Sequence, residues 1–205
     1  MHDARTEDPR AADADADGGL RGRLVRVGVE LVDAEGVQAL SLREIARRAG
    51  VSHGAPRRHF PTHLDLLSAI ARQGFAELAA RVAAEDRETA APRERIELLA
   101  RVYLDHAGTR RGMYELMFRH DLLESGRLGL RETSLPLFAR LAGLVALVRP
   151  GADPAVVAGA LWANLHGIAQ LWHWGSLRLV TGGDDPGPLL AAALDAHLGP
   201  VEPAP

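Results

Sequence analysis

The sequence lacks cysteine and lysine and contains few aromatic residues. Without cysteine the chain can form neither a disulfide framework nor a thiolate metal site. Aromatic residues make up 4% of the 205 residues, and the abundance of alanine and aliphatic residues favours helices over sheets. All 24 basic residues are arginines, whose planar guanidinium groups bind phosphate and guanine bidentately. The N-terminus has no apolar signal segment, so we expect a cytoplasmic protein.

Patterns typical of enzymes are also missing from the sequence. No glycine-rich phosphate loop follows a strand pattern, and no G-x-S-x-G motif is present. The spacing HxxxH occurs at His59 and His63, but these residues lie on either side of Pro61. Acidic pairs such as Glu85–Asp86 lie at charge-rich helix ends, where solvation is the ordinary role. We therefore expect no catalytic residue, no metal site and no cofactor.

The charge is distributed unevenly along the chain, although the formal net charge is only −3. Residues 1–19 carry two arginines against six acidic residues, a net charge of −4. Residues 20–60 carry eight arginines against four acidic residues, a net charge of +4. A local basic surface in an acidic protein is typical of a DNA-binding domain. Residues 1–19 show no apolar periodicity, and we expect them to be a disordered acidic tail.

Residues 41–60 contain the clearest pattern in the chain, SLREIARRAGVSHGAPRRHF. Ser41 can cap a helix, and Glu44 completes a capping box three residues later. Gly50 follows the apolar stripe of this helix at the position where a left-handed residue ends a helix, and Ser52 can cap the next one. Two short helices joined by a tight turn form a helix-turn-helix, whose second helix can enter the DNA major groove. An ordinary corner between two helices with solvated arginines would show the same pattern.

The pattern over residues 20–67 is similar to the N-terminal domain of the tetracycline-repressor (TetR) family of transcriptional regulators. The matching pieces, in order, are AEGVQALSLREIARRAGVS, SHGAPRRHF and PTHLDLL. The resemblance implies an all-α protein with a three-helix DNA-binding head and a helical ligand-binding and dimerisation domain. It also implies a homodimer that binds a palindromic double-stranded DNA operator, most often as a repressor, and responds to a small-molecule effector. Family members usually have Tyr where this chain has Arg57, and Lys where it has His63.

The DNA-binding residues implied by the resemblance lie in the turn, the second helix and the start of the next helix. We expect Arg57 to contact phosphate, while His53, Ala55 and Arg58 face or border bases. The full set is Arg43, Ser52, His53, Gly54, Ala55, Arg57, Arg58, His59, Thr62 and His63.

Apolar periodicity predicts helices along the rest of the chain, and no strand pattern is present. We expect the DNA-binding domain to span 20–66 and the C-terminal domain to span 67–205. The helices are expected at 20–36, 62–87, from 92 onward, 136–149, 154–177 and 188–198, with a less regular region at 110–135.

Residues 154–177 contain no formal charge and allow three interpretations. A membrane span is one, although Asn164, His166 and other polar residues lie in its middle. A buried helix, covered by the domain core on one side and by a second subunit on the other, is favoured. In the third interpretation, the inward side of this helix also lines a ligand pocket. A helical interaction or membrane-associated adaptor with a purely structural helix-turn-helix is the alternative to a DNA-binding regulator.

The candidate ligand-binding residues combine aromatic rings, thioethers and one histidine. Trp162, His166 and Gly167 resemble the tryptophan–histidine–glycine motif of one class of TetR C-terminal domains. The effector is expected to be hydrophobic. The candidates are Tyr103, Met113, Tyr114, Met117, Phe118, Trp162 and His166.

Overall fold

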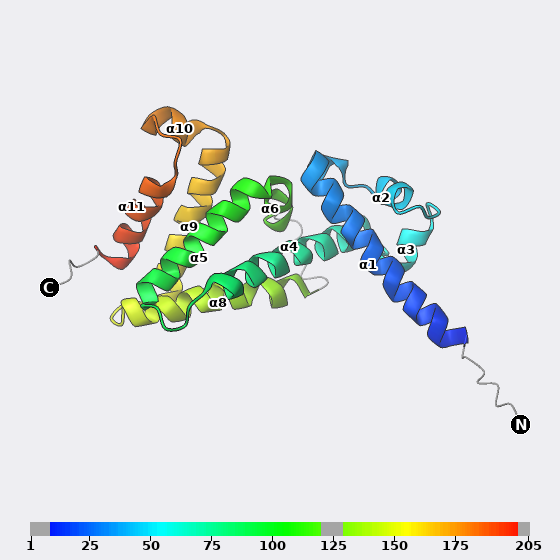
Figure 1. The fold of residues 1–205 in the computed structure, drawn as a ribbon, viewed down its shortest axis with the longest axis horizontal. Coiled ribbons are helices and arrows are strands. Elements are labelled where there is room, and N and C mark those ends of the chain that lie inside the picture. Colours follow the sequence, from blue (N-terminus) through cyan, green and yellow to red (C-terminus); the bar gives the residue numbers. More distant parts are fainter. Residues whose placement is uncertain (1–8, 120–128, 201–205) are drawn as a thin grey trace, which may run out of the picture.

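The computed structural model describes residues 9–119 and 129–200, and every regular element in this part of the chain is helical. The all-α fold predicted from the sequence is therefore confirmed. Figure 1 shows a small group of helices, which we call the head, and a larger group, which we call the body. The head contains α1 (Pro9–Glu35), the short 3-10 helix η1 (Val37–Ala39), α2 (Leu42–Arg48) and α3 (Ala55–His59). The body contains α5 (Pro92–Thr109), α6 (Arg111–Met117), α8 (Leu130–Val148), α9 (Pro154–His173), α10 (Ser176–Thr181) and α11 (Gly187–Leu198).

Helix α4 (His63–Glu85) belongs to both groups and connects them. Its N-terminus has a capping box formed by Thr62 and Asp65. The Thr62 side chain accepts a hydrogen bond from the backbone N–H of Asp65, and the Asp65 carboxylate accepts one from the backbone N–H of Thr62. The first turns of α4 bury Leu66 and Ile70 in the common core, and later turns bury Leu78 and Val82. One rigid helix therefore supplies side chains to the packing of both head and body.

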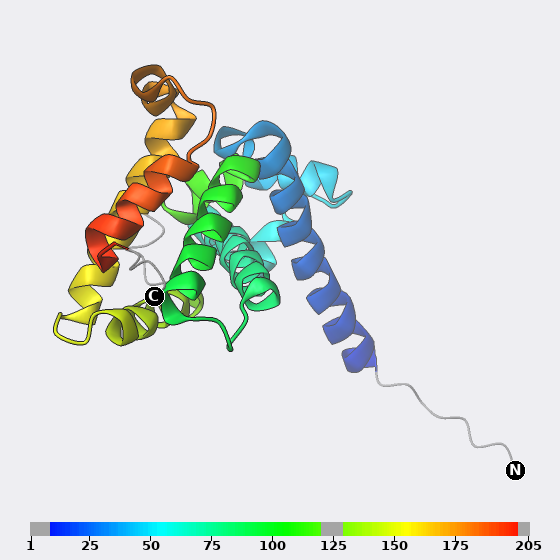
Figure 2. The same cartoon turned by 60° about the vertical axis from the view of Figure 1, so that its left-hand side comes forward.

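Helix α1 begins much earlier than the sequence analysis expects. It starts at Pro9, so residues 9–19, which we expected to be disordered, are helical in the structure. Residues 1–8 lie outside the described residues. Figure 2 shows the N-terminal half of α1 extending away from the rest of the protein. Alanine has the highest helix propensity, and adding residues to a helix already nucleated by packing is favourable, which explains the extension.

Two helix boundaries in the body also differ from those expected. Helix α8 starts at Leu130 and contains Pro136 in its interior, whereas the sequence places Pro136 at the helix start because proline favours that position. Helix α9 ends at His173, and Gly175, with a φ of 79°, separates it from α10. In the part of the chain that the structure describes, no helix is long and apolar enough to cross a membrane.

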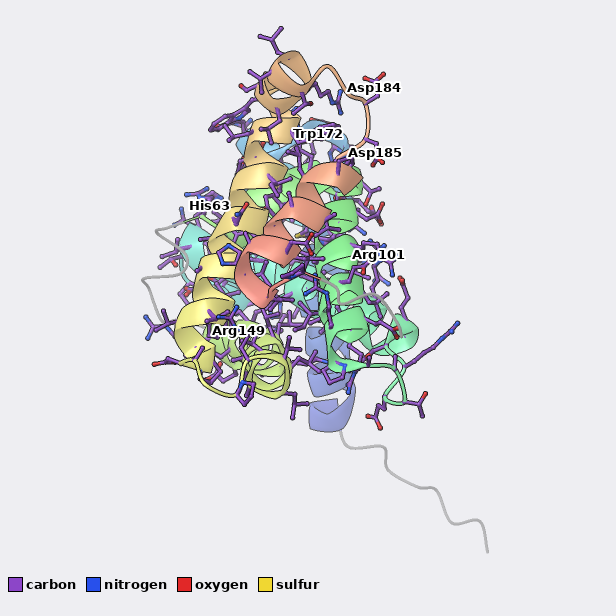
Figure 3. All side chains as sticks on the ribbon, turned by 90° about the vertical axis from the view of Figure 1, so that its left-hand side faces the viewer. His63, Arg101, Arg149, Trp172, Asp184 and Asp185 are labelled. Carbon is purple, nitrogen blue, oxygen red and sulfur yellow. The ribbon has the colours of Figure 1, made fainter. Side chains whose placement is uncertain are left out.

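Helices α9 and α11 pack side by side at one end of the body. Figure 3 looks directly onto this pair, with Trp172 near the α10 end and Arg149 near the opposite end. The inward face of α9 is fully apolar and buried, and it consists of Ala158, Leu161, Leu165, Ile168 and Ala169. Several apolar residues on the opposite face of α9 remain exposed.

Candidate DNA-binding head and candidate ligand cavity

The turn between α2 and α3 is fixed by backbone hydrogen bonds that close the end of α2. Gly50 has a φ of 67°, its N–H donates to the carbonyl of Arg47 over 3.2 Å, and the Val51 N–H donates to the carbonyl of Ala46 over 3.0 Å. This pair of bonds is the Schellman motif, which needs a left-handed residue where this chain has Gly50. Helix α3 then begins at Ala55, so Pro56 lies in its first turn and costs no backbone hydrogen bond. The helix-turn-helix geometry follows from these local preferences.

The capping box predicted at the start of α2 forms only in part. The Ser41 hydroxyl accepts from the Glu44 backbone N–H over 3.1 Å, as expected. The Glu44 carboxylate does not return to the Ser41 backbone; it accepts hydrogen bonds from Arg47 and Arg48 at 2.6 to 2.8 Å. Charge-assisted hydrogen bonds from guanidinium groups are stronger than a bond from a neutral backbone N–H, and this explains why Glu44 binds the two arginines. The hydrogen bonds from Arg47 and Arg48 lower the pKa of Glu44 to about 2.

Pairing within the head separates its arginines into two groups. Arg47 and Arg48 are held by Glu44, and Arg48 is also held by Glu35. Arg43, Arg57 and Arg58 are exposed and form no ion pair with any described residue. Their positive charge is free to act on an external partner.

The structure brings the ten expected DNA-binding residues to one region around α3. Ala55 and His59 are half-buried, whereas the other eight are exposed: Arg43, Ser52, His53, Gly54, Arg57, Arg58, Thr62 and His63. Beneath them, Phe60 is fully buried, and the Arg21 guanidinium of α1 lies 5.2 Å from the centre of its ring. This cation–π contact joins α1 to the end of α3. Sequence analysis missed it because the two residues are far apart in the chain.

The body contains a partly open cavity of about 240 Å³ between α4, α5, α8 and α9. Its walls are formed almost entirely by aliphatic and aromatic side chains. Three of the seven expected ligand-binding residues, Tyr103, Phe118 and Trp162, line it. The other lining residues are Phe75, Leu78, Val82, Ile96, Leu99, Ala100, Ser134, Leu135, Leu137, Phe138, Leu141 and Leu165.

Tyr114 and His166 lie directly behind this wall and form a hydrogen-bonded triad with Tyr103. The two hydroxyl oxygens are 2.9 Å apart, and His166 Nδ1 lies 2.9 Å from the Tyr103 hydroxyl and 2.7 Å from the Tyr114 hydroxyl. Burial raises the pKa of Tyr103 and raises that of Tyr114 to about 12, so both hydroxyls keep their protons. Burial also lowers the pKa of His166, so its ring is neutral at neutral pH. The triad is therefore an uncharged polar group at one end of an apolar cavity.

Phe118 is the aromatic centre of this end of the cavity. Its ring lies 5.0 Å from the ring of Tyr114 and 5.0 Å from that of His166, with Phe75 at 5.6 Å and Trp162 at 6.0 Å. The two remaining candidates, Met113 and Met117, are fully buried and are not among the residues that line the cavity. They pack against Gly74 of α4, where a Cβ would lie 2.7 Å from their sulfur atoms. In the described residues, no three histidine, aspartate or glutamate side chains converge to hold a metal.

Two protein-family models match the chain, one for each part of the fold. Residues 24–70 match the model described as bacterial regulatory proteins, tetR family. Residues 96–197 match the model described as Tetracyclin repressor-like, C-terminal domain. The chain belongs to the TetR family of transcriptional regulators. The narrower class named for its tryptophan, histidine and glycine stays a prediction.

Solved structures of similar proteins have the same architecture as this TetR-family chain. A Rhodococcus sp. RHA1 protein of unknown function is 29% identical, with a TM-score of 0.73, covering 87% of this chain and 93% of that one. A TetR-family member from Streptomyces coelicolor A3 is 28% identical, with a TM-score of 0.60, covering 89% and 99%. The multidrug-binding protein EbrR in complex with ethidium is also 28% identical, with a TM-score of 0.62 and the same coverage. A search of curated proteins finds no match.

In this TetR-family protein, one arginine links the head to the body. Arg110, between α5 and α6, forms ion pairs with Asp33 of α1 at 2.8 Å and with Glu77 of α4 at 3.0 Å. Its guanidinium also donates through Nε to Asp33 over 3.0 Å, so the contact with Asp33 is bidentate. The backbones approach closely here too, because a Cβ at Gly112 would collide with the carbonyl oxygen of Val32. Neither contact was predicted, since residues of three distant segments meet at this point.

His106 lies buried one helical turn before Arg110. Its side chain is 1% exposed, and its Nε2 has no hydrogen-bond partner. Burial, followed by the positive charges of Arg110 and Arg81, lowers its pKa to about 4. The ring is therefore neutral at neutral pH, and protonation would place a charge among buried residues of α5.

Proposed function

We propose that this regulator binds a palindromic DNA operator as a homodimer and leaves it when a small apolar effector occupies the body. The main support is the combination of a helix-turn-helix, whose first helix is capped by Ser41, with three exposed arginines, Arg43, Arg57 and Arg58, that have no acidic partner in the described chain. We assign operator binding to residues 20–66, and effector binding and dimerisation to residues 67–205. The repressor role common in the family is part of the proposal.

The proposed contacts with DNA divide the exposed residues by their chemistry. Arg57 binds phosphate, while His53, Ala55 and Arg58 face bases in the major groove. Two heads of one dimer then read half-sites about 34–36 Å apart, or a multiple of that spacing. Neutralised phosphates release counterions, so affinity falls steeply as salt increases.

An exposed apolar stripe along α9 supports the homodimer. The residues recur at intervals of three or four, so they share one face of the helix. Trp174 is 68% exposed and Val156 is 67% exposed at its two ends, which is unusual for such large apolar side chains. The exposed residues of the stripe are Val156, Ala160, Ala163, Leu171 and Trp174, with the half-buried Gly167 between them, and α11 packs against α9.

A charge placed in this stripe tests the dimer and operator binding together. Ala163→Arg should give a monomer in sedimentation and lose high-affinity binding to a palindromic duplex, while retaining the helical circular dichroism of wild type. Ala83→Arg, on an exposed part of α4, is the matched control and should remain dimeric. A wild-type monomer, or equal affinity for all duplexes at physiological salt, would contradict the proposal.

The apolar cavity supports a small-molecule effector. The cavity lies against α4, and the first residue of this helix, His63, is one of the proposed DNA-binding residues. A ligand acts through this helix only if it prefers the conformation that cannot bind the operator. The structurally similar multidrug-binding protein EbrR has been solved in complex with ethidium, and this supports the proposal that a small molecule binds here.

A further inference from the structure

We infer that the effector is an uncharged amphiphile, with a hydrocarbon body and one hydroxyl or carbonyl group at one end. The inference rests on the proposed ligand-responsive function and gives the chemical class of its ligand. It follows from the direction of the helices around the cavity, from the chemistry of each cavity end, and from the hydrogen-bond capacity of the triad.

The cavity is elongated along α4. Helices α4 and α8 run side by side in the same direction, because Thr133 shares a groove with Ala69 and Ala76, whereas Arg140 reaches Asp86. Lining residues of α4 extend from Phe75 to Val82, seven residues apart. At a rise of 1.5 Å per residue this is about 10 Å, so the cavity accepts a short chain or a ring with a short substituent.

The two ends of the cavity differ in polarity. At the Phe75 end, the lining residues include Tyr103, Ser134 and Trp162, whose side chains carry two hydroxyls and an indole N–H. At the opposite end the walls are purely hydrocarbon, formed by Val82, Ile96, Leu99 and Leu141. A ligand with a polar group at one end and an apolar body matches this arrangement in one orientation only.

None of the described residues that line the cavity carries a charge. Asp86, at the end of α4 beyond Val82, accepts hydrogen bonds from Arg95 at 2.8 and 2.9 Å and from Arg140. Its carboxylate is 1% exposed and is already paired. No charged side chain lines the cavity to pair with an ionised ligand group buried there, and a neutral group avoids the cost of burying an unpaired charge.

The triad is suited to a neutral polar group because it can act as donor or acceptor. When His166 Nδ1 accepts a hydrogen bond, both tyrosine protons are used inside the triad, and a hydroxyl oxygen remains free to accept from the ligand. When Nδ1 carries the proton instead, one hydroxyl proton is free to donate. A ligand hydroxyl satisfies either arrangement, and a ligand carbonyl satisfies the second.

Three probes that share an eight-carbon chain test the charge. Octan-1-ol, octanoate and octylammonium are titrated into the purified dimer at pH 7, with tryptophan fluorescence and calorimetry as readouts. We expect octan-1-ol to bind at least tenfold more tightly than either ion. Octanoate binding as tightly as the alcohol would overturn the inference and indicate that Arg140 binds a carboxylate, and equal binding of octylammonium would overturn it as well.

A single-atom change tests the role of the triad. Tyr103→Phe removes the hydroxyl of the one triad residue that lines the cavity, but it keeps the ring and the hydrogen bond between Tyr114 and His166. It should weaken octan-1-ol binding five- to tenfold and leave binding of 1-chlorooctane, which has no hydroxyl, unchanged. Ser134→Ala, the matched loss of the other cavity hydroxyl, should change neither by more than twofold. A larger effect at Ser134 would overturn the assignment to the triad.

A further variant tests whether the probes bind in this cavity, independently of operator binding. Ala100→Leu places three further carbons in the cavity, and it should reduce binding of all probes by at least tenfold without unfolding the protein. If no probe binds to wild type, or Ala100→Leu binds them as wild type does, the inference fails. If octan-1-ol binds as expected but leaves operator affinity unchanged, the ligand class stands and the proposed regulation fails.

Discussion

The ion pair between Arg110 and Asp33 should contribute measurably to stability, because it joins the head to the body. Asp33→Asn removes the carboxylate from α1 but keeps its shape, and it leaves the pair between Arg110 and Glu77 in place. The effect is therefore limited to one contact between two parts of the fold.

The expected magnitude follows from the exposure of the two side chains, 32% for Arg110 and 30% for Asp33. Fully exposed pairs contribute between zero and about 1 kcal/mol, whereas breaking a buried pair costs about 3–5 kcal/mol. Because this pair is bidentate but partly solvated, we expect a loss of about 1 kcal/mol. For a chain of this length, that lowers the melting temperature by about 2–4 °C.

The assay is thermal unfolding followed by circular dichroism, arranged as a double-mutant cycle with Arg110→Met. The two single variants should each melt earlier than wild type, and the double variant should melt close to Arg110→Met. Arg111→Ala is the matched control, because Arg111 is 58% exposed and, among the described residues, pairs only with Glu115 of its own helix. Additive effects in the double variant, or a wild-type melting temperature for Asp33→Asn, would show that the pair does not connect head and body.

Three further predictions concern single side chains. Arg57→Ala should weaken binding to all duplexes similarly and reduce the slope of log affinity against log salt concentration by about one unit. Arg47→Ala should have less effect, because Arg47 is already paired with Glu44. A change in the preferred base would contradict the assignment of Arg57 to phosphate. Because burial lowers the pKa of His106 from 6.5 to about 4, the unfolded chain takes up its proton first, so stability falls as pH drops from 6.5 to 4, by about 3 kcal/mol at the lower end. His106→Leu should flatten urea-derived stabilities over that range. Asp86→Asn should cost about 3 kcal/mol or more in the same assay, because it leaves two partly buried arginines without their anion.

Local features of the head could be predicted from the sequence because they depend on residues close together. The cap at Thr62 follows from side-chain hydrogen bonds over three residues, and the left-handed Gly50 follows from backbone hydrogen bonds within five. The expected cap of α3 at Ser52 is wrong, because α3 begins at Ala55 after Gly54 without a side-chain cap. The capping box at Ser41 was predicted only in part. Arg47 and Arg48 lie three and four residues after Glu44, but residue spacing alone does not show that they, rather than the Ser41 N–H, donate to its carboxylate.

Contacts that depend on the relative position of helices could not be predicted. Residue type identified Tyr103, Tyr114 and His166 as polar candidates, but only packing brings residues 103, 114 and 166 within hydrogen-bond distance. The same residue-type argument selected Met113 and Met117, which face α4 instead of the cavity. Apolar residues on α6 look alike in sequence whichever neighbour they face.

The close approach of Gly112 to the Val32 carbonyl determines where loss-of-control variants should be found in a genetic screen. Because a Cβ at 112 would collide with the Val32 carbonyl, any other residue there should push α6 away from the end of α1, at a distance from the cavity and from the proposed DNA-binding residues. Selection for regulators that no longer respond correctly should therefore recover substitutions at this glycine alongside those in the two sites. Such variants would still bind octan-1-ol in the body and would differ from wild type only in how the head responds.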